Sequence, residues 1–391
     1  MIVLLWFSLF VVAYTFVGYG FLLYFIIKIK RSVKGKPVVP PVIPDALPTC
    51  TLVVAAYNEE HFILQKIANS LELKYPEGKL KFVFVTDGSS DRTPEIIAQY
   101  PQIQLLHRPE RAGKIAAVHR AMKQVDTEVV VFTDANTFLN PEAIERICRH
   151  YSDRTVGAVA GEKRVQVDNS ADASAAGEGF YWKYESTLKK WDSELYSVVG
   201  AAGELFSVRR DLYQDVPPDT VLDDFMISML IAEQGYRIIY EPDAYALETA
   251  SENVSEELKR KIRIAAGGIQ SILRLKSLLF SVKYPLLSFQ YVSHRVLRWT
   301  VTPFFLILAF LINMQLAAVH YSLFYTLLFM AQVAFYLLAA LGFLMEKRHI
   351  RIKALFIPYY FCVMNYAVLA GILRYFTKKQ SAVWEKAQRK M

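Results

Sequence analysis

The chain has 391 residues, a formal net charge of +8 and a hydrophobic content of 53%. That content exceeds the roughly 45–50% of ordinary soluble domains, and the excess lies at the two ends of the chain. Basic residues flank the apolar runs, which favours anionic lipid headgroups and argues against nucleic acid as a partner. The cysteines Cys50, Cys148 and Cys362 lie far apart in sequence, which excludes a disulfide framework and a cysteine metal site.

The first predicted element is an uncharged stretch over residues 2–27, longer than the roughly 20 residues that a helix needs to cross a bilayer. It is too long for a cleaved signal peptide, and no clear cleavage site follows it. We therefore expect a transmembrane helix over residues 1–28 and a basic, proline-rich linker over residues 29–49. The basic residues of this linker place the next segment in the cytoplasm by the positive-inside rule.

Residues 50–255 alternate between strand and helix patterns. Short apolar runs at 52–56, 82–85, 103–106 and 129–132 are typical of buried parallel strands. Helical stretches at 59–73 and 112–125 lie between them, and Asn140 followed by Pro141 predicts a further helix start. Such a series predicts an α/β domain with a mainly parallel sheet covered on both faces.

Residues 256–298 are basic and amphipathic, so we expect helices that lie along the membrane surface. His294, Arg295 and Arg298 are expected at the level of the lipid headgroups. Three apolar segments follow within residues 299–376, at 301–316, 322–344 and 354–373, and residues 377–391 form a basic tail. The side on which the tail lies stays open, because four crossings would place its basic residues outside.

Polar and acidic side chains directly follow three of the predicted strands, in the segments 53–60, 84–93 and 131–137. In open α/β sheets, ligands bind at the carboxyl ends of the strands. Turns also favour Asp, Asn, Gly and Ser, so turn formation would explain any one of these segments alone. Three of them at strand ends predict a shared binding crevice.

The sequence lacks a glycine-rich phosphate loop, so a phosphorylated ligand would need a metal ion and basic side chains. Asp134 and Asn136, two residues apart at a strand end, offer oxygen ligands for Mg²⁺ or Mn²⁺. Such an ion would bridge a diphosphate and neutralise it as it leaves. A solvated turn or a helix cap is the alternative for this pair.

The ordered motifs within residues 50–270 resemble glycosyltransferase family 2, which has the GT-A nucleotide-sugar fold. Its membrane-bound members include cellulose, chitin, hyaluronan and poly-N-acetylglucosamine synthases. The resemblance places the D-x-D metal motif on Asp134 and Asn136. In this sequence Asn136 stands where the family has the second Asp of that motif. It places the R-x-G-K segment on Arg111, Gly113 and Lys114. The implied donor nucleotide site consists of Ala56, Asn58, Glu59, Asp87, Asp91 and Lys114.

Asp223 and Asp224, in VLDDFMIS, resemble the family's acidic catalytic pair, which implies that Asp224 is the base and Asp223 its helper. A carboxylate suits removal of a proton from an attacking sugar hydroxyl, and its neighbour raises one pKa of the pair. The alternative is an acidic helix N-terminus.

The acceptor side is implied by two further segments. Gly203 and Glu204 lie in GAAGELFSVRR, which resembles the family's glycine-rich acceptor strand. Arg260 and Arg263 match the first and fourth positions of the Q/R-x-x-R-W motif, where cations would bind the diphosphate. Ile264 replaces the tryptophan of that motif, so we expect products of one or a few sugars.

The resemblance implies an inverting transferase that uses a nucleoside diphosphate sugar, with UDP as the expected nucleotide. The acceptor would be a glycan or a lipid-linked sugar, in the synthesis of a cell-surface polysaccharide or glycolipid. We expect an integral protein of the plasma membrane whose catalytic domain is cytoplasmic. The alternative is a catalytically silent membrane assembly protein that retains the fold.

Overall fold

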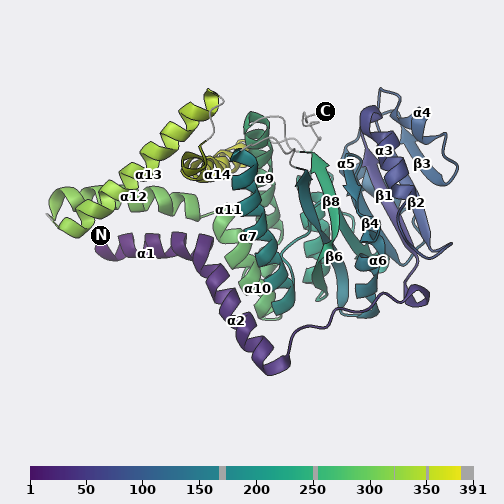
Figure 1. Ribbon diagram of the computed structural model, residues 1–391, viewed down its shortest axis with the longest axis horizontal. Coiled ribbons are helices and arrows are strands. Elements are labelled where there is room, and N and C mark those ends of the chain that lie inside the picture. The colour runs from purple at the N-terminus through teal and green to yellow at the C-terminus, as the bar shows by residue number, and fades with distance from the viewer. Residues whose placement is uncertain (167–172, 250–253, 321, 349–351, 380–391) are drawn as a thin grey trace.

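A computed structural model describes residues 1–166, 173–249, 254–320, 322–348 and 352–379 (Figure 1). One eight-stranded sheet runs through the middle of the molecule in the order β3-β2-β1-β4-β7-β6-β8-β5. Its strands are β1 (Cys50–Ala56), β2 (Leu80–Asp87), β3 (Ile103–Arg108), β4 (Val129–Asp134), β5 (Thr137–Leu139), β6 (Val156–Gln166), β7 (Leu205–Arg209) and β8 (Arg237–Thr249).

The first four strands in sheet order are parallel, as the sequence predicts. Ala56 pairs with Thr86, and Ala55 with Asp134, so the carboxyl ends of β1, β2 and β4 lie side by side. The second half of the sheet is mixed, because β7 runs antiparallel to both β4 and β6. This reversal brings the segment before β7 to the carboxyl end of β4, where Leu205 pairs with Thr133.

Helices cover both faces of the sheet. On one face α5 (Lys114–Met122), α8 (Asp223–Glu233) and α10 (Pro285–Tyr291) contribute to a large buried apolar cluster. On the other face α3 (Glu60–Leu71), α4 (Thr93–Ile97) and α6 (Ala143–Cys148) pack against a second cluster. These two cores account for the continuous apolar character of the central strands, since a strand buried on both faces needs apolar residues throughout.

The helix predicted at Asn140 begins later than expected, because α6 starts at Ala143. The Asn140 side chain instead bridges to β8: its Oδ1 accepts from the Tyr245 amide at 2.8 Å, and its Nδ2 donates to the Asp243 carbonyl at 3.1 Å. The predicted helix therefore forms, but the Asn140 side chain bonds to β8 and does not cap α6.

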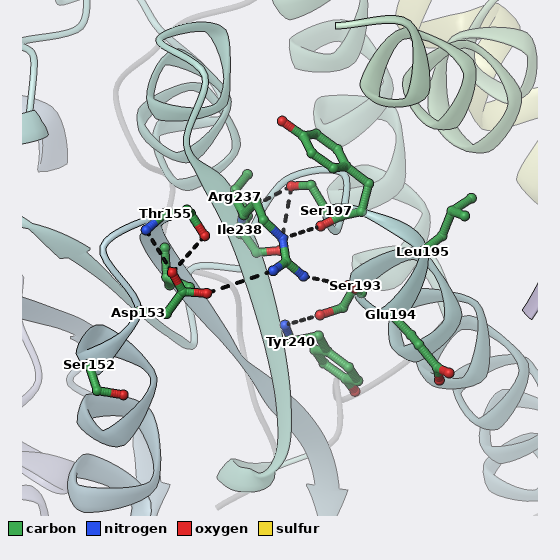
Figure 2. Close-up of polar contacts among 12 residues, drawn as sticks. Ser152, Asp153, Thr155, Ser193, Glu194, Leu195, Ser197, Arg237, Ile238 and Tyr240 are labelled. Carbon is green, nitrogen blue, oxygen red and sulfur yellow. Dashed lines mark hydrogen bonds and ion pairs between the residues drawn. The ribbon is translucent and has the colours of Figure 1, made fainter. Parts of the chain in front are cut away.

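Arg237, the first residue of β8, joins this strand to the C-terminal end of the long helix α7 (Ala173–Leu195) (Figure 2). The Arg237 guanidinium donates to the Tyr196 carbonyl at 2.8 Å and to the Ser193 carbonyl at 3.4 Å. From the other side, Lys30 donates to the carbonyls of Glu194 and Leu195. Cations are favourable at a helix C-terminus, where the last carbonyls have no partners within the helix.

Four helices of the described residues are long and apolar enough to cross a membrane: Ile2–Lys34, Thr302–Val319, Leu323–Lys347 and Ala354–Phe376. The first comprises α1 (Ile2–Ala13), a π-helical turn η1 (Tyr14–Gly18) and α2 (Tyr19–Lys34), and so runs into the expected linker. The others correspond to α12 (Thr302–Val319), α13 (Leu323–Lys347) and α14 (Lys353–Phe376). In Figure 1 they gather on one side of the sheet domain, an arrangement that suggests a membrane protein with a large extramembrane domain.

The basic amphipathic region forms α9 (Val254–Arg274), α10, a π-helical turn η6 (Val292–Val296) and α11 (Leu297–Trp299). Helix α9 packs along α14. Gly371 permits this close approach, because a Cβ there would lie only 2.5 Å from the Cβ of Ala265.

Candidate active site

The loop after β2 is held by Asp87, a buried carboxylate at the strand end. Its Oδ2 accepts from the amides of Ala112 and Gly113 at 2.7 and 2.6 Å, and its Oδ1 faces Arg120 at 3.3 Å. Asp87 therefore fixes the R-x-G-K segment against the sheet. The observed contacts of its carboxylate are thus with two backbone amides and with the Arg120 side chain.

A small pocket lies beside this loop, lined by Ala55, Ala56, Tyr57, Asp87, Arg111, Gly113, Lys114 and Ala117. The Arg111 guanidinium stacks over the Tyr57 ring at 3.9 Å from its centroid, which is within the range of cation–π contacts. A flat aromatic ring and two cations are suited to a nucleobase and its phosphates. Of the residues expected at the donor site, Ala56, Asp87 and Lys114 line this pocket.

Asn58, Glu59 and Asp91 lie next to the pocket and connect the first two strand-end loops. Asn58 has a left-handed backbone with φ of 53°, and its Oδ1 accepts from the Ser90 amide at 2.8 Å. The Glu59 amide donates to the Thr93 hydroxyl at 2.9 Å. The two Asp91 oxygens accept from the amides of Glu60 and Thr93. All these contacts hold the loops in place.

Lys114 connects three of the expected site carboxylates. Its Nζ donates to Asp134 Oδ1 at 2.9 Å and lies 3.6 Å from Asp223. Burial by itself lowers the pKa of Lys114, but Asp134, Asp223 and Asp224 outweigh that effect and hold the pKa above its usual value. The ammonium is therefore charged throughout the physiological range.

The expected metal ligands, Asp134 and Asn136, follow β4. The hydrogen bond from Lys114 uses only Oδ1 of Asp134. Asn136 is 6% exposed, and its Oδ1 is buried with no hydrogen-bond partner among the described residues. A buried carbonyl oxygen left without a donor fits a hard cation, which takes oxygen ligands.

Metal ligation here would depend on oxygens from outside the protein. The described residues contain no group of three or more His, Cys, Asp or Glu that could hold a metal ion. One carboxylate and one amide leave most positions of a six-coordinate ion to water and phosphate oxygens. That composition is usual for Mg²⁺ at phosphate-transfer sites.

Asp223 and Asp224 are the first two residues of α8. Burial, and after it the charge of Asp223, raises the pKa of Asp224 to about 7, despite the opposing Lys114. Gly203 faces this carboxylate closely, since a Cβ there would lie 3.3 Å from Asp224 Oδ2. A carboxylate with a pKa near neutrality matches the requirement for a general base.

Glu204 has a different environment. Its Oε1 accepts from Lys163 at 2.6 Å and lies 3.6 Å from Arg260. Burial alone would raise the pKa of Glu204, but Lys163 and Arg260 hold it well below its usual range. Lys163 also pairs with Glu248. Glu204 is therefore a permanently charged partner of basic residues and a poor proton acceptor.

The other acceptor-side residues lie near the membrane helices. Arg260 pairs with Glu204 and Glu248, and Arg263 lies one turn further along α9. Ile264 lines a large cavity together with Glu204 and Asp224. Trp299, which comes from α11, lines the same cavity and supplies an aromatic surface at a place where α9 has none.

Sequence reasoning missed several polar residues that the fold brings to the site. Lys66 on α3 is fully buried, donates to Thr133 Oγ1 and to the Thr137 carbonyl, and has a pKa that burial lowers to about 7 despite the charge of Asp134. Its polar position among the apolar residues of an amphipathic helix was the available signal. For Lys163, on β6, no signal existed, because its partner Glu204 is distant in sequence.

His294, expected at the level of the lipid headgroups, is buried inside the protein. The side chain is 0% exposed and lies between Asp192, at 2.6 Å, and Glu185, at 3.3 Å. Tyr19 of the first apolar helix also donates to Asp192. A buried network of this kind connects the first apolar helix, α7 and η6.

Comparison with known proteins agrees with this geometry. Residues 51–216 match the family described as "Glycosyl transferase family 2". "Poly-beta-1,6-N-acetyl-D-glucosamine synthase" of Staphylococcus aureus is 28% identical over 281 residues, which are 69% of this chain and 66% of the relative. The protein of that name from Staphylococcus epidermidis is 26% identical over 234 residues, 57% of this chain and 55% of the relative. The matches thus span less than two thirds of these relatives.

A solved structure covers nearly the whole chain. "Mannosyltransferase PcManGT from Pyrobaculum calidifontis in complex with GDP-Man and Mn2+" has a TM-score of 0.73 and 25% sequence identity, and the alignment covers 96% of this chain and 100% of that chain. The likeness therefore includes the apolar helices as well as the sheet domain. The fold and the motifs agree: this chain carries a glycosyltransferase family 2 domain of the GT-A fold.

Proposed function

We propose that this protein is an inverting, metal-dependent glycosyltransferase that transfers a sugar from a nucleoside diphosphate sugar, with UDP as the nucleotide, to a hydroxyl of a glycan or lipid-linked acceptor at the membrane. The observation that carries the proposal is the grouping of Asp134, Lys114 and the Asp223–Asp224 pair at the carboxyl ends of β1 and β4. A base of near-neutral pKa and a permanent cation lie within this one group.

The donor would enter with its base beside Tyr57 and Arg111 and its diphosphate towards Lys114. Asp134 and Asn136 would hold Mg²⁺ or Mn²⁺, which supplies Lewis-acid stabilisation to the leaving diphosphate. The Mn²⁺ in the complex of the similar mannosyltransferase supports a divalent ion. Lys114 adds a second positive charge at the leaving group.

In the transfer step, Asp224 takes the proton of the acceptor hydroxyl as the acceptor oxygen attacks the anomeric carbon. The bond between that carbon and the diphosphate oxygen breaks, and its electron pair leaves with the nucleoside diphosphate. A single in-line displacement inverts the configuration of the anomeric carbon. General-base assistance of this kind contributes about 10²–10⁴-fold to the rate.

A catalytically silent assembly protein is the second candidate. A catalytically silent protein does not require a general base. The pKa of Asp224, which is raised to about 7, therefore favours the enzyme. The poly-N-acetylglucosamine synthases among the relatives support a role in polysaccharide synthesis. The donor sugar is a question for experiment, because the similar mannosyltransferase carries GDP-Man.

The test uses the purified full chain with a panel of nucleotide sugars and measures release of the nucleoside diphosphate. We expect release from one donor, dependent on Mg²⁺ or Mn²⁺, and its loss in Asp134→Ala. Undiminished release in excess chelator would contradict the metal role. Donor binding without release, at any acceptor, would favour the silent protein.

A further inference from the structure

The large cavity next to Asp224 is bounded by two of the apolar helices. It has an empty volume of about 1280 Å³, open to the outside. Phe16 of the first apolar helix and Met364 and Val368 of α14 form an apolar wall, while Glu204 and Asp224 lie at the catalytic side. A ligand that fills this cavity therefore contacts membrane-spanning helices and the proposed base together.

One side of the cavity is cationic. Arg295 and Arg298 both line it, and both bind the same carboxylate, Glu185, at 2.8 and 3.1 Å. Burial alone would raise the pKa of Glu185, but Arg295, His294 and Arg298 together hold it well below its usual range. Glu185 thus binds two guanidinium groups, while Asp192 lies 2.6 Å from His294 Nδ1 behind them.

Lys189 adds a further basic side chain, which lies near the Glu162 carboxylate without a direct ion pair. It lines the same cavity, is 8% exposed, and forms no hydrogen bond or ion pair with any described residue. Its Nζ lies 5.7 Å from the centroid of the Tyr240 ring. Glu162 is the nearby carboxylate, and it accepts a hydrogen bond from Ser186.

Burying a charge without a partner costs free energy, so a buried ammonium that faces a cavity indicates a missing anion. Lys189, Arg295 and Arg298 bring three basic groups to this side of the cavity, where Glu185 binds both arginines and Glu162 lies near Lys189. The arginine forks suit the oxygens of a phosphate. The apolar wall beside them suits a hydrocarbon chain.

We propose that Lys189, Arg295 and Arg298 form an anion subsite for the phosphate of a lipid acceptor, whose hydrocarbon chain lies along the first apolar helix and α14 and whose sugar hydroxyl reaches Asp224. The subsite selects a charged lipid over a neutral glycan. This inference rests on the proposed transfer reaction, because it assigns the acceptor of the same site.

Binding to the full chain in detergent tests the subsite without requiring turnover. Three probes carry the same sugar: farnesyl diphosphate linked to N-acetylglucosamine, the uncharged farnesyl N-acetylglucosaminide, and soluble N-acetylglucosamine 1-phosphate. We expect the charged lipid to bind more tightly than both others by calorimetry. Equal binding of the two lipids by the unaltered protein would overturn the phosphate assignment, and equal binding of the soluble phosphate would overturn the lipid assignment.

Variants of Lys189 distinguish the effect of a lost charge from that of a disrupted fold. Lys189→Gln should raise the Kd of the charged lipid roughly 10- to 100-fold, as for loss of a charge-assisted contact, and leave that of the uncharged lipid unchanged. Lys189→Arg should restore binding, and Lys190→Gln, at the exposed neighbouring position, should have no effect. An unchanged Kd in Lys189→Gln would refute the subsite.

The nucleotide-sugar Kd of each variant reports whether the fold is intact. If Lys189→Gln does not fold, the comparison of charged and uncharged lipids in the unaltered protein still tests whether the phosphate contributes to binding. Failure of the proposed function has a different signature: no donor is turned over, whatever the acceptor lipids show.

Discussion

Residues of the same type have opposite properties in this site, and their neighbours determine which. Asp224 and Glu204 are both buried carboxylates at the acceptor side. Burial, and after it the charge of Asp223, raises the pKa of Asp224 to about 7, whereas Lys163 and Arg260 hold the pKa of Glu204 below its usual value despite its burial. Only the first is suited to accept a proton at neutral pH. The motif resemblance already implies Asp224 as the base, and these contacts supply the physical reason.

Asp224→Asn should therefore lower turnover by about 10²–10⁴-fold, because it retains the shape of the side chain and removes the base. The affinity for the nucleotide sugar should change little, since Lys114, Tyr57 and Arg111 remain. Steady-state kinetics at saturating donor measures the effect. Asp223→Asn is the matched control and should cost less; a dead Asp223→Asn beside an active Asp224→Asn would exchange the two roles.

The raised pKa of Asp224 also predicts a pH dependence. The groups that face it are Asp223 and Glu204, which favour the protonated form, and Lys114, which opposes it. Below pH about 7 the carboxyl is protonated and cannot act as a base. The acceptor kcat/KM should thus fall about tenfold per pH unit below that value and level off above it. A flat profile from about pH 5.5 to about pH 8.5 would contradict Asp224 as the base.

At the scale of elements, several contacts join the sheet domain to the apolar helices, and two of them can be tested separately. One is the packing of α9 along α14, where Gly371 approaches Ala265 and Ala266. Another is the end of α7, whose carbonyls accept from Arg237 on one side (Figure 2) and from Lys30 on the other. Both place the cavity wall relative to the catalytic residues.

Gly371→Ala should destabilise the protein by about 1–3 kcal/mol, because the added Cβ would lie 2.5 Å from the Cβ of Ala265 and 2.8 Å from the Ala266 amide nitrogen. Thermal unfolding in detergent measures the change. Gly18→Ala is the control, since its Cβ would meet Tyr14 at an ordinary 3.4 Å. Equal unfolding temperatures for the two variants would show that α9 and α14 accommodate the added Cβ without a loss of stability.

Arg237→Ala should loosen the C-terminal end of α7, because the Ser193 and Tyr196 carbonyls lose a charged donor. A hydrogen bond to a charged group contributes about 1.5–3 kcal/mol. Hydrogen exchange should become faster in residues 193–197. Arg154→Ala, at an exposed position of the same domain, should leave this exchange unaltered. Unchanged exchange in Arg237→Ala would mean that Lys30 alone holds the helix end.

At the scale of the whole molecule, the sheet domain lies on one side of the apolar helices (Figure 1). The basic residues after the first apolar helix predict that this side is the cytoplasm. Lys30 and Arg31 also bind Glu194 at the end of α7, so part of the basic cluster contacts the domain directly. The cytoplasmic position of the sheet domain is a prediction that rests on the positive-inside rule.

Protease added to sealed, right-side-out cells should leave the domain between β1 and β8 uncut, and the same protease should cleave it after lysis. Fragments are detected by antibodies against this domain. A tag in the linker of residues 36–43 provides a control for access, because that stretch lies on the same side as the domain. Cleavage of the domain before lysis would reverse the predicted topology.

Local sequence was enough to predict the fold class, the apolar helices and the strand-end motifs. Apolar runs, helical periodicity and turn residues act over a few positions, so they can be recognised without the fold. The motif segments carrying Ala56, Asp87, Asp134 and Asp224 are of this kind, and the similarity to glycosyltransferase family 2 confirmed the family.

Tertiary structure decided what depends on contacts between distant segments. The antiparallel return of β7 places Glu204 at β4, where Thr133 binds its carbonyl. The charge state of Glu204 then depends on Lys163 and Arg260, and the cationic cavity on Lys189 and Arg295, each from a different helix or strand. A pKa and a buried charge balance depend on distance and burial, which the order of residues along the chain does not contain.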